Sequence, residues 1–244
     1  SSDFAEVARR DLAFIYFSHK KYKQSVELFK DVRESSLFDS DFYFKYGYSL
    51  FIMGNYGDAK YYFNKIKDGG SKYRPFAIYY YAHILYLQEL YELSLSDFKL
   101  LQDDKIFRSI IPYYITQIYF VMTDYESLIN YAVPYLDKVI PTRRDELNRL
   151  IAESYYQLSD FTNSEVYLKR YLESSDIISP LDYFQLGYIN VVLEDFDESI
   201  YYLEKIDLNS DSLSQYVSYY LGQSYLRSGK KQFALQSFRK ASNI

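Results

Sequence analysis

Residue types that could do chemistry are few in this chain of 244 residues. It holds two histidines, His19 and His83, and no cysteine. Neither histidine has the neighbours that a metal site needs. Acidic pairs such as Asp103-Asp104 fall at expected turns, where solvation explains them, and no metalloprotease, phosphate-loop, dinucleotide or nucleophile-elbow motif occurs. The sequence therefore predicts a protein without catalytic residues, a bound metal or a cofactor.

The elements that would position any site follow a repeat of about 34 residues. Each period carries an aromatic residue at the turn between two helical segments, with successive spacings of 34, 35, 34, 36 and 35 residues. These turn residues are Tyr22, Tyr56, Tyr91, Tyr125, Phe161 and Phe196, and Lys231 takes the seventh place 35 residues later. Such a period is typical of a solenoid of stacked units, which predicts a binding surface and not a single active cleft.

The second period shows the internal pattern best. Apolar residues recur three and four apart over 41–52 and again over 56–67, as helices with one buried face require. Glycines break the chain between the two segments at Gly54 and after them at Gly69 and Gly70. Each period therefore reads as two helices joined by a short turn.

The residues at fixed places in this pattern carry a family resemblance. In the second period they are Tyr43, Tyr46, Gly47, Leu50, Tyr56, Ala59 and Phe63, and in the seventh Leu221, Gly222, Tyr225, Gly229, Ala234, Phe238 and Ala241. The pattern resembles the tetratricopeptide repeat (TPR), in which small residues let two helix backbones approach. The resemblance implies an all-α, right-handed solenoid of about seven helix-turn-helix repeats. One array over residues 1–244 is expected, with repeats at 6–39, 40–74, 75–108, 109–143, 144–179, 180–214 and 215–244.

The fourth repeat departs from the pattern. Pro134 falls inside its expected second helix, where proline removes a backbone donor and clashes with the preceding turn. Leu128 and Thr116 stand where small residues are expected. We expect the second helix to kink or break at Pro134.

The resemblance places the first helix of each repeat along a concave groove. Residues spaced four and then three apart on these helices share one stripe, and it is strongly aromatic through the first four repeats. The predicted groove residues are Phe14, Phe44, Tyr48, Phe51, Tyr79, His83, Tyr86, Tyr113, Gln117, Phe120, Arg149, Tyr156, Phe184 and Tyr188. The rings could instead pack between neighbouring first helices, and His83 could be a packed histidine. Arg149 is the best candidate for an anionic contact, although it could pair within its helix with Glu153 or Asp145.

Composition limits the classes of partner that the chain is expected to bind. The net charge of −5 and the isoelectric point of about 5.2 argue against nucleic acid, which needs a basic face. No apolar run reaches the roughly 18 residues of a membrane span. With 32 tyrosines, the chain is similar in composition to the long, tyrosine-rich TPR arrays of bacterial cell-envelope proteins. That similarity points to the envelope or periplasm and leaves the cytoplasm open.

These observations favour a non-catalytic scaffold that binds a peptide or helix of another protein in an aromatic groove. An architectural role is the alternative, because the last helix lacks a polar cap and could contact a second copy or further repeats. Glycan binding is a third hypothesis, weakened by the absence of tryptophan.

Overall fold

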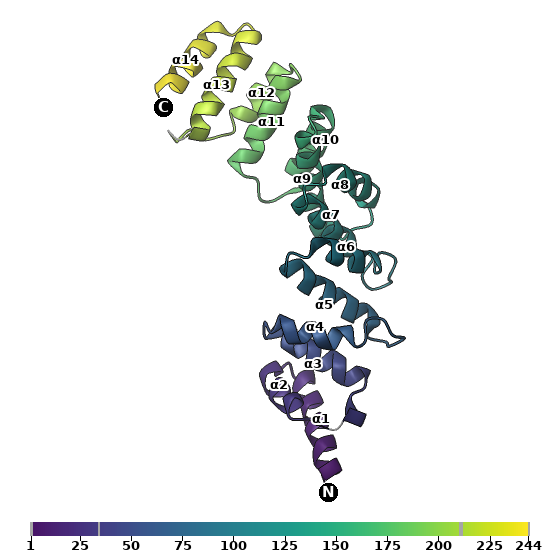
Figure 1. Ribbon diagram of the computed structural model, residues 1–244. Coiled ribbons are helices and arrows are strands. Elements are labelled where there is room, and N and C mark those ends of the chain that lie inside the picture. The colour runs from purple at the N-terminus through teal and green to yellow at the C-terminus, as the bar shows by residue number, and fades with distance from the viewer. Residues whose placement is uncertain (1, 34, 210–211, 244) are drawn as a thin grey trace. The chain divides into compact units, whose positions relative to one another are not determined.

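The computed structural model describes residues 2–33, 35–209 and 212–243 (Figure 1). Within these ranges there are fourteen α-helices, two 3-10 helices and no strand. The first helices of successive pairs are α1 (Ser2–Ser18), α3 (Ser40–Ile52), α5 (Arg74–Leu87), α7 (Ile111–Val121), α9 (Pro141–Gln157), α11 (Pro180–Val192) and α13 (Ser212–Arg227). The second helices are α2 (Tyr22–Lys30), α4 (Tyr56–Asn64), α6 (Tyr91–Lys99), α8 (Tyr125–Ala132), α10 (Phe161–Ser174), α12 (Phe196–Leu203) and α14 (Lys231–Asn243).

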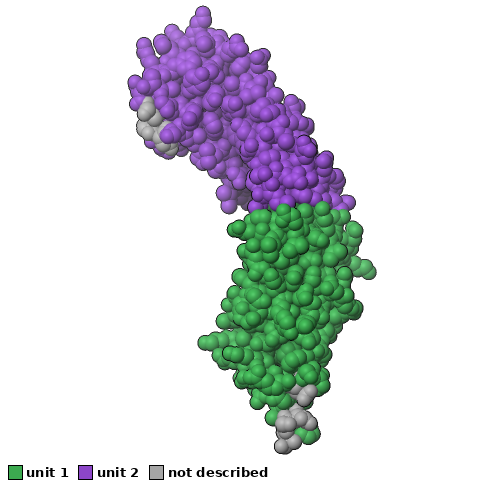
Figure 2. Space-filling model, in the orientation of Figure 1, with its two compact units in different colours: residues 1–118 green, residues 119–244 purple. Residues whose placement is uncertain are grey.

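The chain divides into two compact units, residues 1–118 and 119–244, and the division falls within α7 (Figure 2). In both units the helices pack on their neighbours along the chain, and first helices also contact one another, α1 with α3, α3 with α5 and α11 with α13. The fold is therefore an all-α solenoid of helix-turn-helix pairs, as the repeat predicts.

Small residues bring the two helices of a pair together. In three pairs a second-helix serine hydroxyl donates to a first-helix alanine carbonyl twelve residues earlier. These bonds are Ser25 Oγ to Ala13 O at 2.9 Å, Ser94 Oγ to Ala82 O at 2.8 Å and Ser164 Oγ to Ala152 O at 2.8 Å. In other pairs a glycine makes the space: a Cβ on Gly187 would lie 2.5 Å from Leu203, and one on Gly222 would lie 2.7 Å from Phe238. A larger residue at these places would push the helices apart.

Every turn within a pair has the same backbone. The residue two before the turn residue has a positive φ in all seven pairs, and only two of the seven are glycine. They are Lys20, Gly54, Glu89, Thr123, Ser159, Glu194 and Gly229, with φ between 56° and 77°. In the second pair the Asn55 amide donates to Leu50 O and the Gly54 amide to Phe51 O, which is the Schellman arrangement. Side chains at the next position, Asn55 and Asp160 among them, then cap the second helix.

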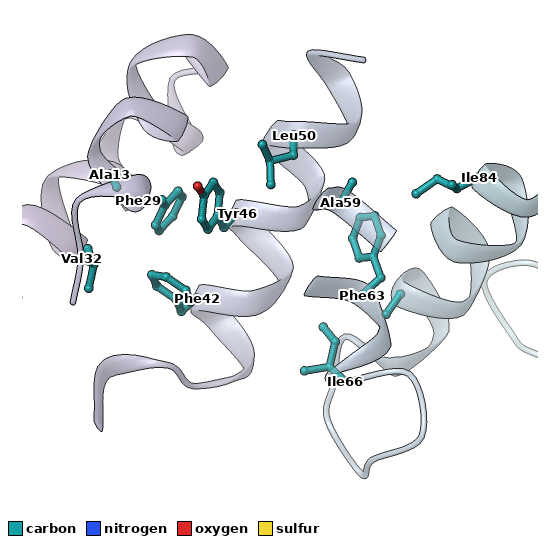
Figure 3. Close-up of a cluster of buried hydrophobic side chains, with 11 residues drawn as sticks. Ala13, Phe29, Val32, Phe42, Tyr46, Leu50, Ala59, Phe63, Ile66 and Ile84 are labelled. Carbon is teal, nitrogen blue, oxygen red and sulfur yellow. The ribbon is translucent and has the colours of Figure 1, made fainter. Parts of the chain in front are cut away.

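Large side chains fill the space between neighbouring pairs. Phe29 of α2 stacks on Tyr46 of α3 with ring centroids 5.1 Å apart and meets Phe42 edge-on at 5.2 Å (Figure 3). The same cluster continues through Ala59 and Phe63 of α4, all of them buried. In the second unit Leu203, Val217 and Leu221 form the corresponding cluster between α12 and α13. The core is thus a line of clusters, each shared between adjacent pairs.

The irregularity at Pro134 is confirmed. The α8 helix ends at Ala132, and the chain continues as a 3-10 helix over Val133–Tyr135 (η2). Proline has no N–H for the α-helical bond, so the tighter turn replaces it.

Four helices begin earlier than the expected repeat boundaries, and two of them are α1 at Ser2 and α5 at Arg74, where repeats starting at 6 and 75 were expected. The α9 helix begins at Pro141, where a fifth repeat starting at 144 was expected, because Ile140 is extended and Pro141 suits the first helical position. The α13 helix begins at Ser212, three residues before the expected start of the seventh repeat at 215. Pro141 is therefore the first residue of α9. The expected single array over 1–244 remains a prediction.

Alanine substitutions at Gly54 and Gly57 distinguish two effects on stability, the positive φ that the turn requires and the helix propensity of the residue. Gly54 has φ +77°, whereas Gly57 lies inside α4, and neither has a heavy atom near an added Cβ. We expect Gly54→Ala to lower the free energy of unfolding by about 1 kcal/mol. Gly57→Ala should raise it by about 0.5–1 kcal/mol, since alanine favours the helix. Urea unfolding of the two variants measures both, and a Gly54→Ala protein as stable as Gly57→Ala would contradict this explanation of the turn.

Candidate functional site

The predicted groove residues lie on the first helices, and we call the side of each first helix that carries them its first-helix face. Phe14 is on α1; Phe44, Tyr48 and Phe51 are on α3; Tyr79, His83 and Tyr86 are on α5; Tyr113, Gln117 and Phe120 are on α7; Arg149 and Tyr156 are on α9; Phe184 and Tyr188 are on α11. Their side chains are half-buried, apart from Tyr113, which is buried, and Arg149, which is exposed. The face is thus accessible in part and is not an open row of free rings.

Many of these rings contact the next first helix. Tyr48 meets Tyr80 of α5 at a centroid distance of 5.0 Å, and His83 meets Tyr114 of α7 at 4.5 Å. Tyr188 meets Tyr220 of α13 at 5.1 Å. The partner rings stand one residue past the predicted stripe, which therefore does not include Tyr80, Tyr114 and Tyr220. Their equivalent places in the repeat were the signal that could have found them.

A second set of rings packs on the turn of its own pair. The aromatic residue five before the turn residue contacts the turn ring in each of the first five pairs. The pairs are Phe17–Tyr22 at 5.9 Å, Phe51–Tyr56 at 5.5 Å, Tyr86–Tyr91 at 5.6 Å, Phe120–Tyr125 at 6.1 Å and Tyr156–Phe161 at 5.6 Å. Such contacts, worth about 0.5–1.5 kcal/mol each, hold the turn against the first helix.

The remaining predicted residues of the first unit also have close neighbours. Phe44 stacks on Tyr73 at 4.4 Å, and Tyr79 stacks on Phe107 at 4.6 Å. The Phe14 ring lies under the Lys45 ammonium at 3.7 Å. On α7 the Gln117 Nε2 donates to the Tyr113 hydroxyl at 2.6 Å. In this unit the predicted rings are half-buried or buried and contact other side chains of the chain.

His83 is enclosed by rings. Tyr79, Phe98 and Tyr114 stand edge-on to the imidazole at 4.5, 5.2 and 4.5 Å. Burial disfavours the charged imidazolium and lowers the pKa of His83 from its ordinary 6.5 to about 4. A neutral imidazole that packs like an aromatic ring fits this environment.

The low pKa of His83 predicts a pH dependence of stability. The unfolded chain takes up this proton near pH 6.5, whereas the folded chain resists it until about pH 4. The neutral His83 therefore makes its full contribution to the free energy of unfolding above pH 6.5. This contribution, up to about 3 kcal/mol, is lost as the pH falls to 4. The free energy of unfolding is measured with urea from pH 7 to pH 4. We expect it to fall less in His83→Phe than in the wild type, because the variant has no imidazole to protonate. Parallel pH curves for the two proteins would contradict the assignment.

In the second unit a polar network crosses from α9 to α11. Arg149 Nε donates to Asp182 Oδ1 at 3.1 Å, and Asp182 Oδ2 accepts from the Ser179 amide at 2.8 Å as part of a capping box. A second hydrogen bond joins the same two helices: Gln185 Nε2 of α11 donates to Glu153 Oε2 of α9 at 2.6 Å. The expected intrahelical partners of Arg149 are thus replaced by Asp182, 33 residues further along the chain. No local spacing predicts this pair, because its two residues are 33 positions apart.

Two adjoining cavities open on this part of the first-helix face. Each has a volume of about 280 Å³, and both are lined by Tyr156, Phe184 and Tyr188. The first adds Arg149 and Glu153, and the second adds Tyr216 and Tyr220. The Arg149 side chain is 56% exposed while its partner Asp182 is 3% exposed, so the cation is held by a buried carboxylate and presented to the cavity.

The described residues hold no cluster of three or more His, Asp or Glu side chains that could bind a metal ion. None of the helices within the described ranges has the length and apolar character for crossing a bilayer. The two cavities are lined by aromatic rings, by the Gln185 amide and by the Arg149 guanidinium. These groups can make apolar contacts and hydrogen bonds to a ligand.

Comparison with known proteins gives the class of fold. No protein-family model and no curated protein sequence matches this chain. The C-terminal part of a TPR repeat-containing protein from Cytophaga hutchinsonii is similar in structure, with a TM-score of 0.66 and 14% identity over 95% of this chain and 93% of that chain. A tetratricopeptide repeat protein from Parabacteroides merdae has a TM-score of 0.55 and 13% identity over 98% of this chain and 93% of that one.

A third similar structure is a complex of Naa15 and Naa10 bound to HypK-THB. Its TM-score is 0.57 at 13% identity, over 96% of this chain and 36% of the other. Identities this low show the fold alone. The chain has the tetratricopeptide-type fold that its repeat resembles.

Proposed function

We propose that the chain is a protein-interaction scaffold and that α9, α11 and α13 bind a peptide segment of a partner protein. The observation that carries the proposal is the pair of adjoining cavities lined by Tyr156, Phe184 and Tyr188. Successive first helices supply these rings, so an extended segment laid along the face would meet one helix after another. Aromatic side chains bury large areas at low cost in entropy and are common at binding hot spots.

Arg149 gives the surface a charged contact beside the rings. Its Nε donates to Asp182, and within the described residues its terminal nitrogens donate no hydrogen bond. A guanidinium fixed in this way has its planar fork ready for a carboxylate. Both Glu153 oxygens accept amide hydrogens, from Gln185 and Gln157. The proposed segment therefore combines apolar side chains with an acidic group.

The similar structure of Naa15 and Naa10 supports the general idea, because it is a complex bound to HypK-THB. The proposal carries only this mode of action to the present chain. It implies no enzyme activity.

A self-association or array-extending role is the second candidate. Ile15 on α1 is 53% exposed, whereas Ile84 and Ile189 at the equivalent place are fully buried. On α14, Leu235 is 53% exposed where the equivalent Ile200 is 6% exposed. These apolar faces match the two sides of the contact between neighbouring pairs. Sedimentation that shows a monomer at all concentrations would remove self-association.

Peptide selection tests the first candidate. We expect a displayed random peptide library to yield binders of the full chain, and Phe184→Ala to weaken them at least tenfold, or about 1.4 kcal/mol. Arg149→Gln should weaken the acidic binders more than neutral ones. The matched control is Tyr201→Ala, which removes a 53% exposed ring from the second helix α12.

The comparison of the two alanine variants decides the result. Circular dichroism and a thermal melt establish that each variant is folded. Equal affinity of wild type and Phe184→Ala, or an equal loss in Tyr201→Ala, would contradict binding on the first-helix face.

A further inference from the structure

At two junctions between neighbouring pairs, Phe and Tyr side chains form a ring cluster at the turn end of the first-helix face. Between the first two pairs it consists of Phe17, Tyr22 and Tyr48, whose centroids are 5.7–5.9 Å apart. These residues stand five before the turn residue, at the turn residue, and eight before the next turn residue. Each ring contacts the other two, so the space is filled from within the chain.

The fifth and sixth pairs use the same three places. Tyr156 contacts the turn residue Phe161 at 5.6 Å and Tyr188 of the next first helix at 6.3 Å. The arrangement therefore occurs in both units and does not depend on one local sequence.

Between the sixth and seventh pairs two of the three rings are replaced. The equivalent residues are Val191, Phe196 and Gln223, so only the turn ring is left. Gln223 turns toward its own helix and donates to the Tyr219 hydroxyl at 2.7 Å. A cavity of about 390 Å³ opens here, lined by Val191, Phe196, Gln223 and Leu226 among others.

The walls of this cavity suit an aromatic group. Val192 is 41% exposed and Leu226 is 50% exposed, so apolar surface remains uncovered. The Arg227 guanidinium lies 5.6 Å from the Phe196 ring centroid, and its Nη2 is 4.0 Å from Glu194 Oε1 at the rim. The volume is within the range of small ligand pockets, about 300–1,000 Å³. A ring entering beside Phe196 would meet aliphatic side chains, the Phe196 ring and the Arg227 guanidinium.

We infer that this cavity is a subsite for an aromatic side chain of the bound partner, which takes the place that Phe17 and Tyr48 occupy between the first two pairs. The missing rings of the chain define the chemistry of the occupant. The inference rests on the proposed function, since the ring belongs to the same peptide that crosses α11 and α13. It adds a Phe or Tyr side chain to the acidic and apolar groups already proposed.

The test uses the full chain and free amino-acid amides as probes. N-acetyl-phenylalaninamide is titrated while the assigned methyl resonances of Val191, Val192 and Leu226 are followed by NMR. We expect saturable shifts of these methyls, at least threefold smaller shifts with N-acetyl-leucinamide at the same concentration, and loss of the Leu226 shifts in Val191→Phe. That substitution supplies the ring from the chain, as Tyr156 does in the fifth pair. Val191→Ile, which adds no ring, should keep the shifts.

Gln223→Tyr is the second filling variant, because it restores the ring that Tyr48 supplies. It should abolish the shifts even if Val191→Phe does not fold. Absence of shifts in the wild type, equal shifts with the leucine amide, or unchanged shifts in a folded filling variant would each overturn the inference. Since the probes need no partner protein, such a failure is distinct from a failure of the peptide selection with Phe184→Ala.

Discussion

The close approach of two helices within each pair is the contact on which the rest of this structure depends. Ser25, Ser94 and Ser164 bond to alanine carbonyls of the first helix, and glycines make the same space elsewhere. Because the helices meet there with little side-chain volume between them, the larger residues project outward to the neighbouring pair. The line of clusters and the exposed edge of the first-helix face both follow from this arrangement.

Tyrosines and phenylalanines join the pairs on that face, and they also limit what it can bind. In the first unit the rings of Tyr48, Tyr79 and His83 are engaged with those of the next helix. Cavities occur around Phe184, where aromatic rings line them, and around Val191, where two of the three rings are replaced. The proposed aromatic subsite lies where the chain lacks two rings that the first two pairs contain.

The repeat made much of the fold predictable. The turn residues and small-residue places located the helix pairs, and Pro134 located the break after Ala132. Contacts between helices were harder, because they depend on the rotation of each helix against its neighbour. A stripe drawn on one helix therefore missed Tyr80 and Tyr114, and local spacing suggested Glu153 for Arg149 where the structure has Asp182. The positive φ at Thr123 and Glu89 was also not predictable from the sequence, since these residue types rarely adopt the left-handed conformation.

The proposed binding of partners on the first-helix face of the second unit can be checked by a crystal structure of the chain with one selected peptide. The peptide is expected to cross α9, α11 and α13, with an acidic group at Arg149 and an aromatic side chain beside Phe196. A peptide bound instead on the second helices α10 and α12, or only against α1 or α14, would contradict it.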